Sequence, residues 1–182
     1  QPASLGLQKI AEEGDRSQAL TDLAPMVGGS ILDLESPLTS PLPPLGSFSV
    51  TVGADAAHPL LSAMWMLGRT NDGFAGLDSI DLAAAAGTSI DVVGLDAGTE
   101  NNNEKAAYMA ALGGHLRDPE NGVIHLHPGI LGIADAPIAW NWTNPVARIQ
   151  VARASAVPEP GALSLLVVGL LPLIRYRRRQ AA

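Results

Sequence analysis

The chain contains no cysteine and few aromatic residues. None of its 182 residues is a cysteine, and Phe, Trp and Tyr together make up 4% of the sequence. Disulfides and thiolate metal sites are therefore excluded, and this is compatible with bacterial export, where many proteins fold without disulfides. The 19 glycines and 14 prolines favour short strands joined by loops over a helical bundle.

Basic residues are scarce over most of the chain. Up to Val157 there are 7 basic and 17 acidic residues, a net charge of minus 10, whereas the last 25 residues hold four arginines and one glutamate. Nucleic acids and anionic membrane surfaces are densely negative, so an acidic body binds both poorly. We therefore expect no nucleic-acid partner. The same excess of carboxylates is compatible with binding a cation.

The sequence also lacks the short motifs of common enzyme classes. It contains no nucleophile elbow, no His-Glu metalloprotease helix and no phosphate-binding loop. An enzyme would have to use paired carboxylates such as Asp72 and Asp96, for instance to hydrolyse an extracellular polysaccharide. We expect a protein that is not an enzyme, with such a hydrolase as the weaker alternative.

Residues 71–100, NDGFAGLDSIDLAAAAGTSIDVVGLDAGTE, contain two acidic turns separated by two alternating runs. The runs at 77–82 and 90–95 have the period of two that is typical of strands. An antiparallel pairing of these strands would return the chain to the end of the sheet from which it started. The sequence therefore predicts that the two acidic turns lie close together.

Three carboxylates would then converge, those of Asp72, Asp96 and Glu100. Close carboxylates repel one another and raise each other's pKa unless a cation lies among them. Calcium suits irregular loops because it accepts carboxylate, carbonyl and water oxygens, and Gly98 can take the positive φ that a tight loop needs. An alternative remains open, in which Asp96 only accepts a hydrogen bond from the backbone two residues on.

The motifs NDGFAGLDSIDL and GLDAGTE resemble the spondin domain, the amino-terminal β-sandwich of animal F-spondin and mindin that is also found in bacterial secreted proteins. Residues 96–99 match the family's D-A-G-T run, with Glu100 as a conservative replacement. The upstream matches are Asp72, Phe74, Gly76, Asp78, Ser79, Asp81 and Leu82. The resemblance implies a calcium site whose side-chain ligands are Asp72, Asp96 and Glu100.

The resemblance covers residues 1–153, and ENGVIHLHPGI and WNWTNPVARIQV also look like the bacterial branch of the family. It implies an all-β fold, an antiparallel β-sandwich of the spondin type with short helices. The chain begins with Gln1 and shows no signal peptide, so we expect a fragment or processed form that lacks the first strand or strands. The animal domains are disulfide-bonded and this chain is not, so their partner-binding details do not carry over.

Other segments have the pattern of helices or strands. Short helices are predicted at 5–11 and 16–23, a long loop at 26–44 and a helical turn at 104–112. The predicted strands are 46–52, 60–67 (a central strand buried on both faces), 123–127 and 146–152. On the strand at 123–127, His125 and His127 share a face and could share a metal ion, but no third ligand is tied to them by spacing.

The carboxyl-terminal segment 154–182 resembles a PEP-CTERM sorting signal, which an exosortase recognises. An apolar run at 161–174 follows the sorting motif, and by helix rise it spans about 21 Å, less than the roughly 30 Å of a bilayer core. The motif itself is Val157, Pro158, Glu159 and Pro160, and the basic cluster after the run is Arg175, Arg177, Arg178 and Arg179. The cluster would hold that end in the cytoplasm. We expect a short transmembrane helix, with the body on the periplasmic side of the inner membrane.

Together these features predict an exported, calcium-binding adhesion or matrix protein that reaches the cell surface or the medium after processing. Exosortase would be its processing partner, and an extracellular polysaccharide or a surface protein its ligand, in an exopolysaccharide or biofilm context. A calcium-dependent carbohydrate-binding module is the alternative. In such a module, an open coordination position on the ion would receive sugar hydroxyls.

Overall fold

The computed structural model describes residues 1–37 and 41–154. The chain divides into two units, and the first, Gln1–Ala152, contains every helix and strand given below. The predicted sorting motif, the apolar run at 161–174 and the arginine cluster lie outside the described residues. Within the described ranges, none of the helices has both the length and the apolar character needed to cross a membrane.

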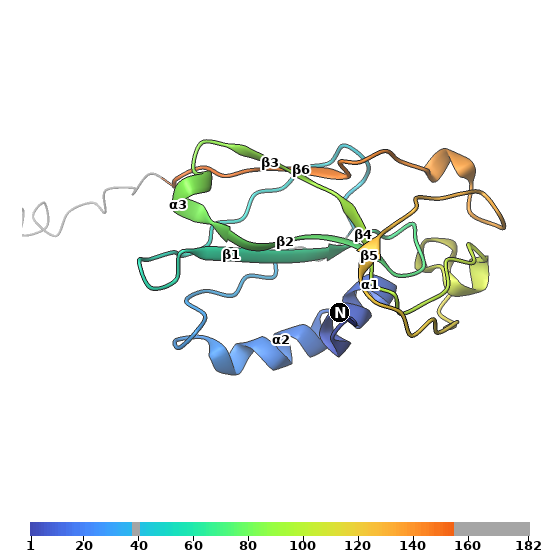
Figure 1. The fold of residues 1–182 in the computed structure, drawn as a ribbon, viewed down its shortest axis with the longest axis horizontal. Coiled ribbons are helices and arrows are strands. Elements are labelled where there is room, and N and C mark those ends of the chain that lie inside the picture. Colours follow the sequence, from blue (N-terminus) through green and yellow to red (C-terminus); the bar gives the residue numbers. More distant parts are fainter. Residues whose placement is uncertain (38–40, 155–182) are drawn as a thin grey trace, which may run out of the picture. The chain divides into compact units, whose positions relative to one another are not determined.

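The described chain is mostly β, with antiparallel sheets and few, short helices (Figure 1). The larger sheet has the strand order β1-β2-β4-β5. Its members are β1 (Leu60–Met66), β2 (Gly73–Asp81), β4 (Gly94–Asp96) and β5 (His125–Leu126). The second sheet pairs β3 (Ser89–Val92) with β6 (Ala147–Gln150). The predicted strands near 60–67, 77–82, 123–127 and 146–152 are therefore confirmed.

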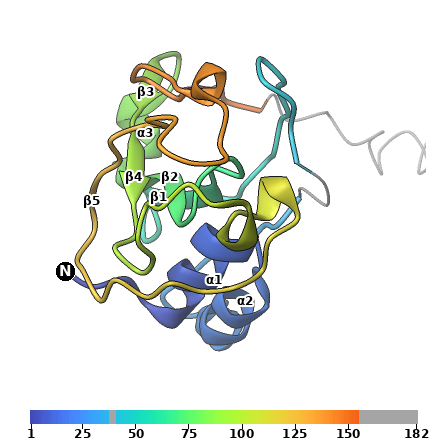
Figure 2. The same ribbon diagram turned by 90° about the vertical axis from the view of Figure 1, so that its right-hand side faces the viewer.

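Two helices precede the sheets, as predicted. They are α1 (Leu5–Glu13) and α2 (Ser17–Leu23). The Ser4 hydroxyl accepts a hydrogen bond from the Leu7 N–H at the start of α1, and Gly14 ends the helix with a φ of 70°. Both helices lie on the side of the larger sheet away from β3 (Figure 2).

Shorter helical turns lie between the strands. They are α3 (Leu82–Ala85) and the 3₁₀ turns η1 (Ala24–Met26), η2 (Ala106–Tyr108), η3 (Ala110–Leu112) and η4 (Ile138–Trp140). The predicted helical turn at 104–112 is confirmed as η2 and η3. α3 was not predicted from the sequence. At its start the Asp81 carboxylate accepts hydrogen bonds from the N–H groups of Ala83 and Ala84.

The main core joins α1 to the acidic turns. Leu7 and Ala11 of α1 pack against Phe74 of β2 and Ala97, which directly follows β4. A second core of Met109, Ile130 and Ala136, with partly buried tryptophans around it, lies under the loops. Because α1 covers Ala97, the helix contributes to positioning the loop that carries Asp96.

The prediction of a strand at 46–52 is wrong. This segment has no regular secondary structure, and its apolar side chains Phe48 and Val50 are 50% and 46% exposed. Alternation makes an extended backbone favourable, but a strand also needs a neighbour with which to exchange hydrogen bonds. Among the described residues, this segment pairs with no strand.

Two further strand predictions need correction. β1 is an edge strand with Leu60 and Met64 exposed, so it is not a central strand buried on both faces. The single strand predicted at 90–95 is two strands, because β3 pairs with β6 while β4 pairs with β2 and β5. The chain passes from one sheet to the other at Val93.

Candidate functional site

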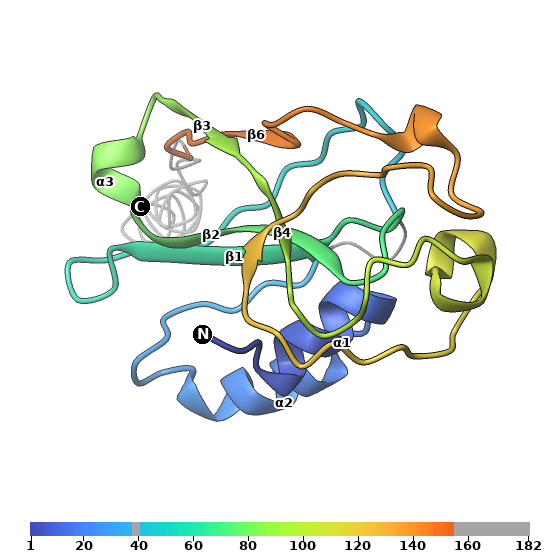
Figure 3. The same ribbon diagram turned by 45° about the vertical axis from the view of Figure 1, so that its right-hand side comes forward.

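Asp72 and Asp96 lie at neighbouring ends of β2 and β4, which pair in the sheet. Figure 3 shows where these two strands lie in the fold. Asp72 directly precedes β2 and Asp96 is the last residue of β4, where it pairs with Gly73 across the antiparallel ladder. The Ala97 N–H also donates to the Asp72 carbonyl oxygen, at 3.2 Å. The antiparallel pairing predicted between 77–82 and 90–95 is only partly correct, because residues 73–75 pair with 94–96 while 89–92 pair with β6. The part that forms brings these two aspartates together.

The Asp72 carboxylate is fully buried, and only one of its two oxygens has hydrogen-bond partners. Its Oδ2 accepts from the backbone N–H groups of Thr99 (2.7 Å) and Glu100 (2.9 Å) and from the Thr99 hydroxyl (3.1 Å). Its Oδ1 is buried and has no hydrogen-bond partner. Burial and the charge of Asp96 raise the pKa of Asp72. A buried carboxylate oxygen without a partner is costly, and a cation would satisfy it.

The Asp96 side chain is also fully buried. Its Oδ1 accepts from the Gly98 N–H at 2.7 Å, which is the local turn predicted as the alternative to an ion site. Gly98 has a φ of 67°, which confirms the predicted positive φ. Asp96 Oδ2 accepts from the Asn102 amide and lies 3.8 Å from Nε2 of His125. The turn therefore occupies only one oxygen of this carboxylate.

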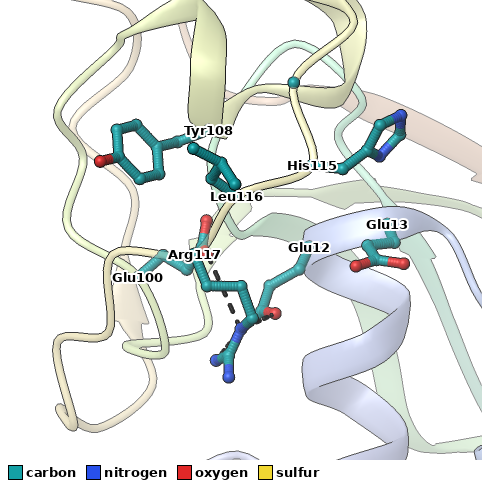
Figure 4. A pocket seen from close by; sticks show the side chains of 8 residues that line it. Glu12, Glu13, Glu100, Tyr108, His115, Leu116 and Arg117 are labelled. Atoms are coloured by element: carbon teal, nitrogen blue, oxygen red, sulfur yellow. Dashed lines mark hydrogen bonds and ion pairs between the residues drawn. The ribbon is translucent and has the colours of Figure 1, made fainter.

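Glu100 contributes to the Asp72 site through its main chain, while its carboxylate belongs to a second cluster (Figure 4). Its Oε1 accepts from the Asp118 N–H at 3.3 Å and lies 3.8 Å from Nε of Arg117. Arg117 makes two 2.7 Å hydrogen bonds to the Glu12 carboxylate on α1. The structure thus brings Asp72 and Asp96 together, and it directs the Glu100 carboxylate to Arg117.

The space beside this second cluster is small. Glu12, Glu100, Arg117, Tyr108 and His115 are among the residues that line a cavity of about 10 Å³. That volume is about what a single water molecule requires. It is far below the roughly 300 Å³ of a small-molecule site, so the cavity does not fit a substrate.

Acidification should stabilise the metal-free chain between pH 7 and 4.5. Burial, followed by the charge of Glu12, raises the pKa of Glu100 from 4.5 to about 7. In that window the folded state binds a proton that the unfolded state has released, so the free energy of unfolding falls as pH rises. We expect a difference on the order of 1 to 3 kcal/mol. Thermal unfolding in chelator at pH 5 and pH 7.5 measures it.

The Glu100→Gln variant is the control for this pH effect. Its amide oxygen can still accept from the Asp118 N–H, but the side chain has no charge to titrate. Its unfolding midpoint should change less between pH 5 and pH 7.5 than that of the parent. A parent profile as flat as that of the variant would show that Glu100 titrates normally.

His125 and His127 differ in their surroundings. The His125 side chain is 49% exposed, and its Nδ1 donates to the Val123 carbonyl at 2.9 Å. His127 is buried against Trp142, and its Nδ1 accepts from the Gly129 N–H. Burial lowers the pKa of His127, so the neutral ring carries its proton on Nε2. That nitrogen has no lone pair to offer, so the two histidines do not form the shared metal pair considered from the sequence.

Side chains alone therefore do not provide enough ligands for a metal ion at Asp72 and Asp96. In residues 1–37 and 41–154, no group of three or more His, Asp and Glu side chains is placed to hold a metal ion. The unpartnered Oδ1 of Asp72 is compatible with a cation ligand, and a calcium ion there would have to draw most of its roughly six to eight oxygens from backbone carbonyls and water.

Sequence reasoning missed Glu104, the residue that organises the neighbouring loop. Glu104 is 2% exposed and has a φ of 54°. Its Oε1 accepts from the Leu131 N–H and its Oε2 from the Ile133 N–H. Its carbonyl oxygen accepts from the backbone N–H groups of Asp135 and Ala136. Its partners lie 27 or more residues away, so no local spacing indicated them.

Comparison with known proteins found no family model that matches the chain and no match among curated proteins.

Proposed function

We propose that this chain is a calcium-stabilised adhesion or matrix protein, exported and sorted by its carboxyl-terminal segment, and that it is not an enzyme. Its fold would be the spondin-type β-sandwich, and residues 154–182 would be a PEP-CTERM signal that an exosortase processes. The resemblance of the motifs in 71–100 and 157–179 supports this proposal. So do the antiparallel sheets of the described chain.

One observation supports the calcium site most strongly, the unpartnered Oδ1 of Asp72. It belongs to a fully buried carboxylate next to a second fully buried carboxylate, Asp96. Two such charges repel in a site with low dielectric. In the proposal Asp72 and Asp96 hold the ion, and Glu100, expected from the resemblance as a third ligand, contributes its main-chain N–H to Asp72 while its carboxylate faces Arg117. A bound calcium would neutralise the buried charge and tie together the ends of β2 and β4.

The burial of Asp72 and Asp96 also argues against the two alternative functions, a polysaccharide hydrolase and a carbohydrate-binding module. A hydrolase that used Asp72 and Asp96 would have to bring them to a glycosidic bond, yet both side chains are 0% exposed. A sugar-binding calcium ion needs an open coordination position, and burial of both carboxylates favours an ion enclosed by protein. We therefore prefer a structural calcium ion. The predicted partner, an extracellular polysaccharide or a surface protein, would bind elsewhere on the body.

Calcium should raise the thermal stability of the chain. At a hundredfold excess over the dissociation constant the gain is about 2.7 kcal/mol, or roughly 5 to 10 °C in midpoint for a chain of this size. Extracellular modules often bind calcium at about 0.1 to 1 mM, so the titration needs ion concentrations well above that range. Thermal unfolding in chelator and in calcium or magnesium at about 10 to 100 mM measures the gain.

The Asp72→Asn variant tests the assignment without removing hydrogen bonds. Its amide oxygen can keep the three hydrogen bonds that Oδ2 accepts, while the charge is lost. In chelator the variant should therefore be at least as stable as the parent, and it should gain nothing from calcium. Asp22→Asn, on the exposed face of α2, is the matched control and should respond like the parent. If Asp72→Asn also gains stability from calcium, Asp72 is not a ligand.

A further inference from the structure

The loop at 130–138, here called the apolar loop, holds three large aliphatic side chains in solvent. Leu131, Ile133 and Ile138 are 51%, 64% and 59% exposed. A Cβ added at Gly132 would lie 2.9 Å from the Ile138 Cβ, so Ile138 lies directly beside the segment that carries the other two. The loop lies at the end of the first unit opposite α3 (Figure 1). A soluble protein rarely gathers large apolar side chains on one exposed loop unless that loop binds something.

Four backbone N–H groups of the apolar loop end on one buried residue, Glu104. Its carboxylate accepts from the N–H groups of Leu131 and Ile133. Its carbonyl oxygen accepts from those of Asp135 and Ala136. Water would satisfy these groups on an ordinary exposed loop, whereas an unpaired N–H in lipid is costly. Because Glu104 pairs them internally, this part of the loop can leave water without losing hydrogen bonds.

An aromatic ring and two cations accompany the apolar loop. Trp140, partly buried at the end of η4, has the Arg69 guanidinium 4.8 Å from its ring centroid. Lys105 is exposed and directly follows Glu104. Among the described residues, neither Arg69 nor Lys105 forms an ion pair with a carboxylate. Tryptophan and basic side chains beside an aliphatic segment are typical of surfaces that enter the membrane interface.

We propose that the apolar loop binds a phospholipid surface, with its aliphatic side chains at the acyl-chain boundary and with Arg69 and Lys105 at the headgroup phosphates. A protein partner fits less well, because protein interfaces carry about one hydrogen bond per 100 to 200 Å². The only polar side chain in 130–138 is that of Asp135, and its Oδ2 already accepts from a backbone N–H of η2 at 2.8 Å. This binding goes beyond the adhesion function and needs no ion at the acidic site.

A probe on the apolar loop tests the proposal. Because the chain has no cysteine, Ile133→Cys in the full chain accepts one environment-sensitive fluorophore. The labelled chain is mixed, in chelator, with an excess of phosphatidylcholine vesicles, with or without phosphatidylglycerol. Emission at 133 should shift to the blue and be quenched by lipids that carry a nitroxide at a depth of about 5 to 10 Å. Leu45→Cys, at a residue that is 105% exposed, is the matched control and should stay in water.

Further variants test the roles of the side chains. Leu131→Ser with Ile138→Ser, in the labelled Ile133→Cys chain, should lower the insertion equilibrium by about 10-fold to 100-fold, since each half-exposed side chain contributes about tenfold or less. Urea unfolding of this variant should match the parent, because both side chains are more than half exposed. Lys105→Gln should weaken insertion roughly fivefold in vesicles that contain phosphatidylglycerol.

The outcomes separate lipid binding from its competitors. Retention of the chain on vesicles by its carboxyl-terminal segment alone would leave both probes in water, and that result overturns the proposal. A blue shift at 133 without vesicles, growing with protein concentration, would show that the apolar loop meets a second copy and would also overturn it. All measurements are made in chelator, so failure of the proposed calcium site would leave the result at 133 unchanged.

Discussion

Replacing Gly98 by alanine should strongly destabilise the folded state. Gly98 has a φ of 67°, and an added Cβ would lie 2.7 Å from both the N and the O of Val123 and 2.8 Å from the Gly122 carbon. These are backbone atoms, so the clash cannot be relieved by a side-chain rotation. The Gly98 carbonyl also accepts from the Gly122 N–H at 2.6 Å. We expect a loss of about 3 to 5 kcal/mol in the free energy of unfolding.

Gly87 offers a matched control for this substitution. It has a similar positive φ of 81°, but an added Cβ there would meet no atom within 4 Å. Gly87→Ala should therefore cost only the strain of the left-handed backbone, about 1 kcal/mol. Urea unfolding of the two variants measures the difference. Equal costs at the two sites would show that the close approach of residues 122–123 to Gly98 is absent in solution.

The Gly98 substitution should also reach the acidic site. The turn at Gly98 sets the N–H groups of Thr99 and Glu100 against Asp72 Oδ2. When the turn opens, Asp72 loses those donors as well as its proposed ion. Any Gly98→Ala protein that remains folded should therefore show a weaker calcium response than the Gly87→Ala protein.

The sequence predicted those parts of the fold that depend on near neighbours. The period of apolar residues predicted α1, α2 and most strands. The positive φ of Gly98 was predicted because its tight loop requires one. The proximity of Asp72 and Asp96 followed from one antiparallel pairing within residues 71–100. In each case the physical cause lies within a short stretch of chain.

The wrong predictions concern features that are determined by contacts with distant parts of the chain. The segment 46–52 alternates like a strand but pairs with no strand among the described residues, and the change of sheet at Val93 depends on β6, more than fifty residues later. The direction of the Glu100 carboxylate is set by Arg117, which in turn is held by Glu12 from the other end of the domain. No spacing rule contains that information.

Loss of the Glu104 carboxylate should be nearly as damaging as the change at Gly98. Its two oxygens accept from the Leu131 and Ile133 N–H groups, and no cation is needed to satisfy it. Hydrogen bonds to a charged group contribute about 1.5 to 3 kcal/mol each, so Glu104→Ala should cost about 3 to 5 kcal/mol. The loop it holds carries Ile130 and Ala136 into the second core, which should loosen as well. Urea unfolding, with the exposed Glu35→Ala as control, measures the cost.

The Glu104→Gln variant separates the hydrogen bonds from the volume of the side chain. Glutamine has nearly the same size, but one oxygen becomes an NH₂ group, which would face a backbone N–H with no acceptor between them. We therefore expect Glu104→Gln to lose at least half as much stability as Glu104→Ala, although it leaves no cavity. If Glu104→Gln is as stable as the parent, packing and not the paired N–H groups holds the loop. In that case the carboxylate has no special role at this position.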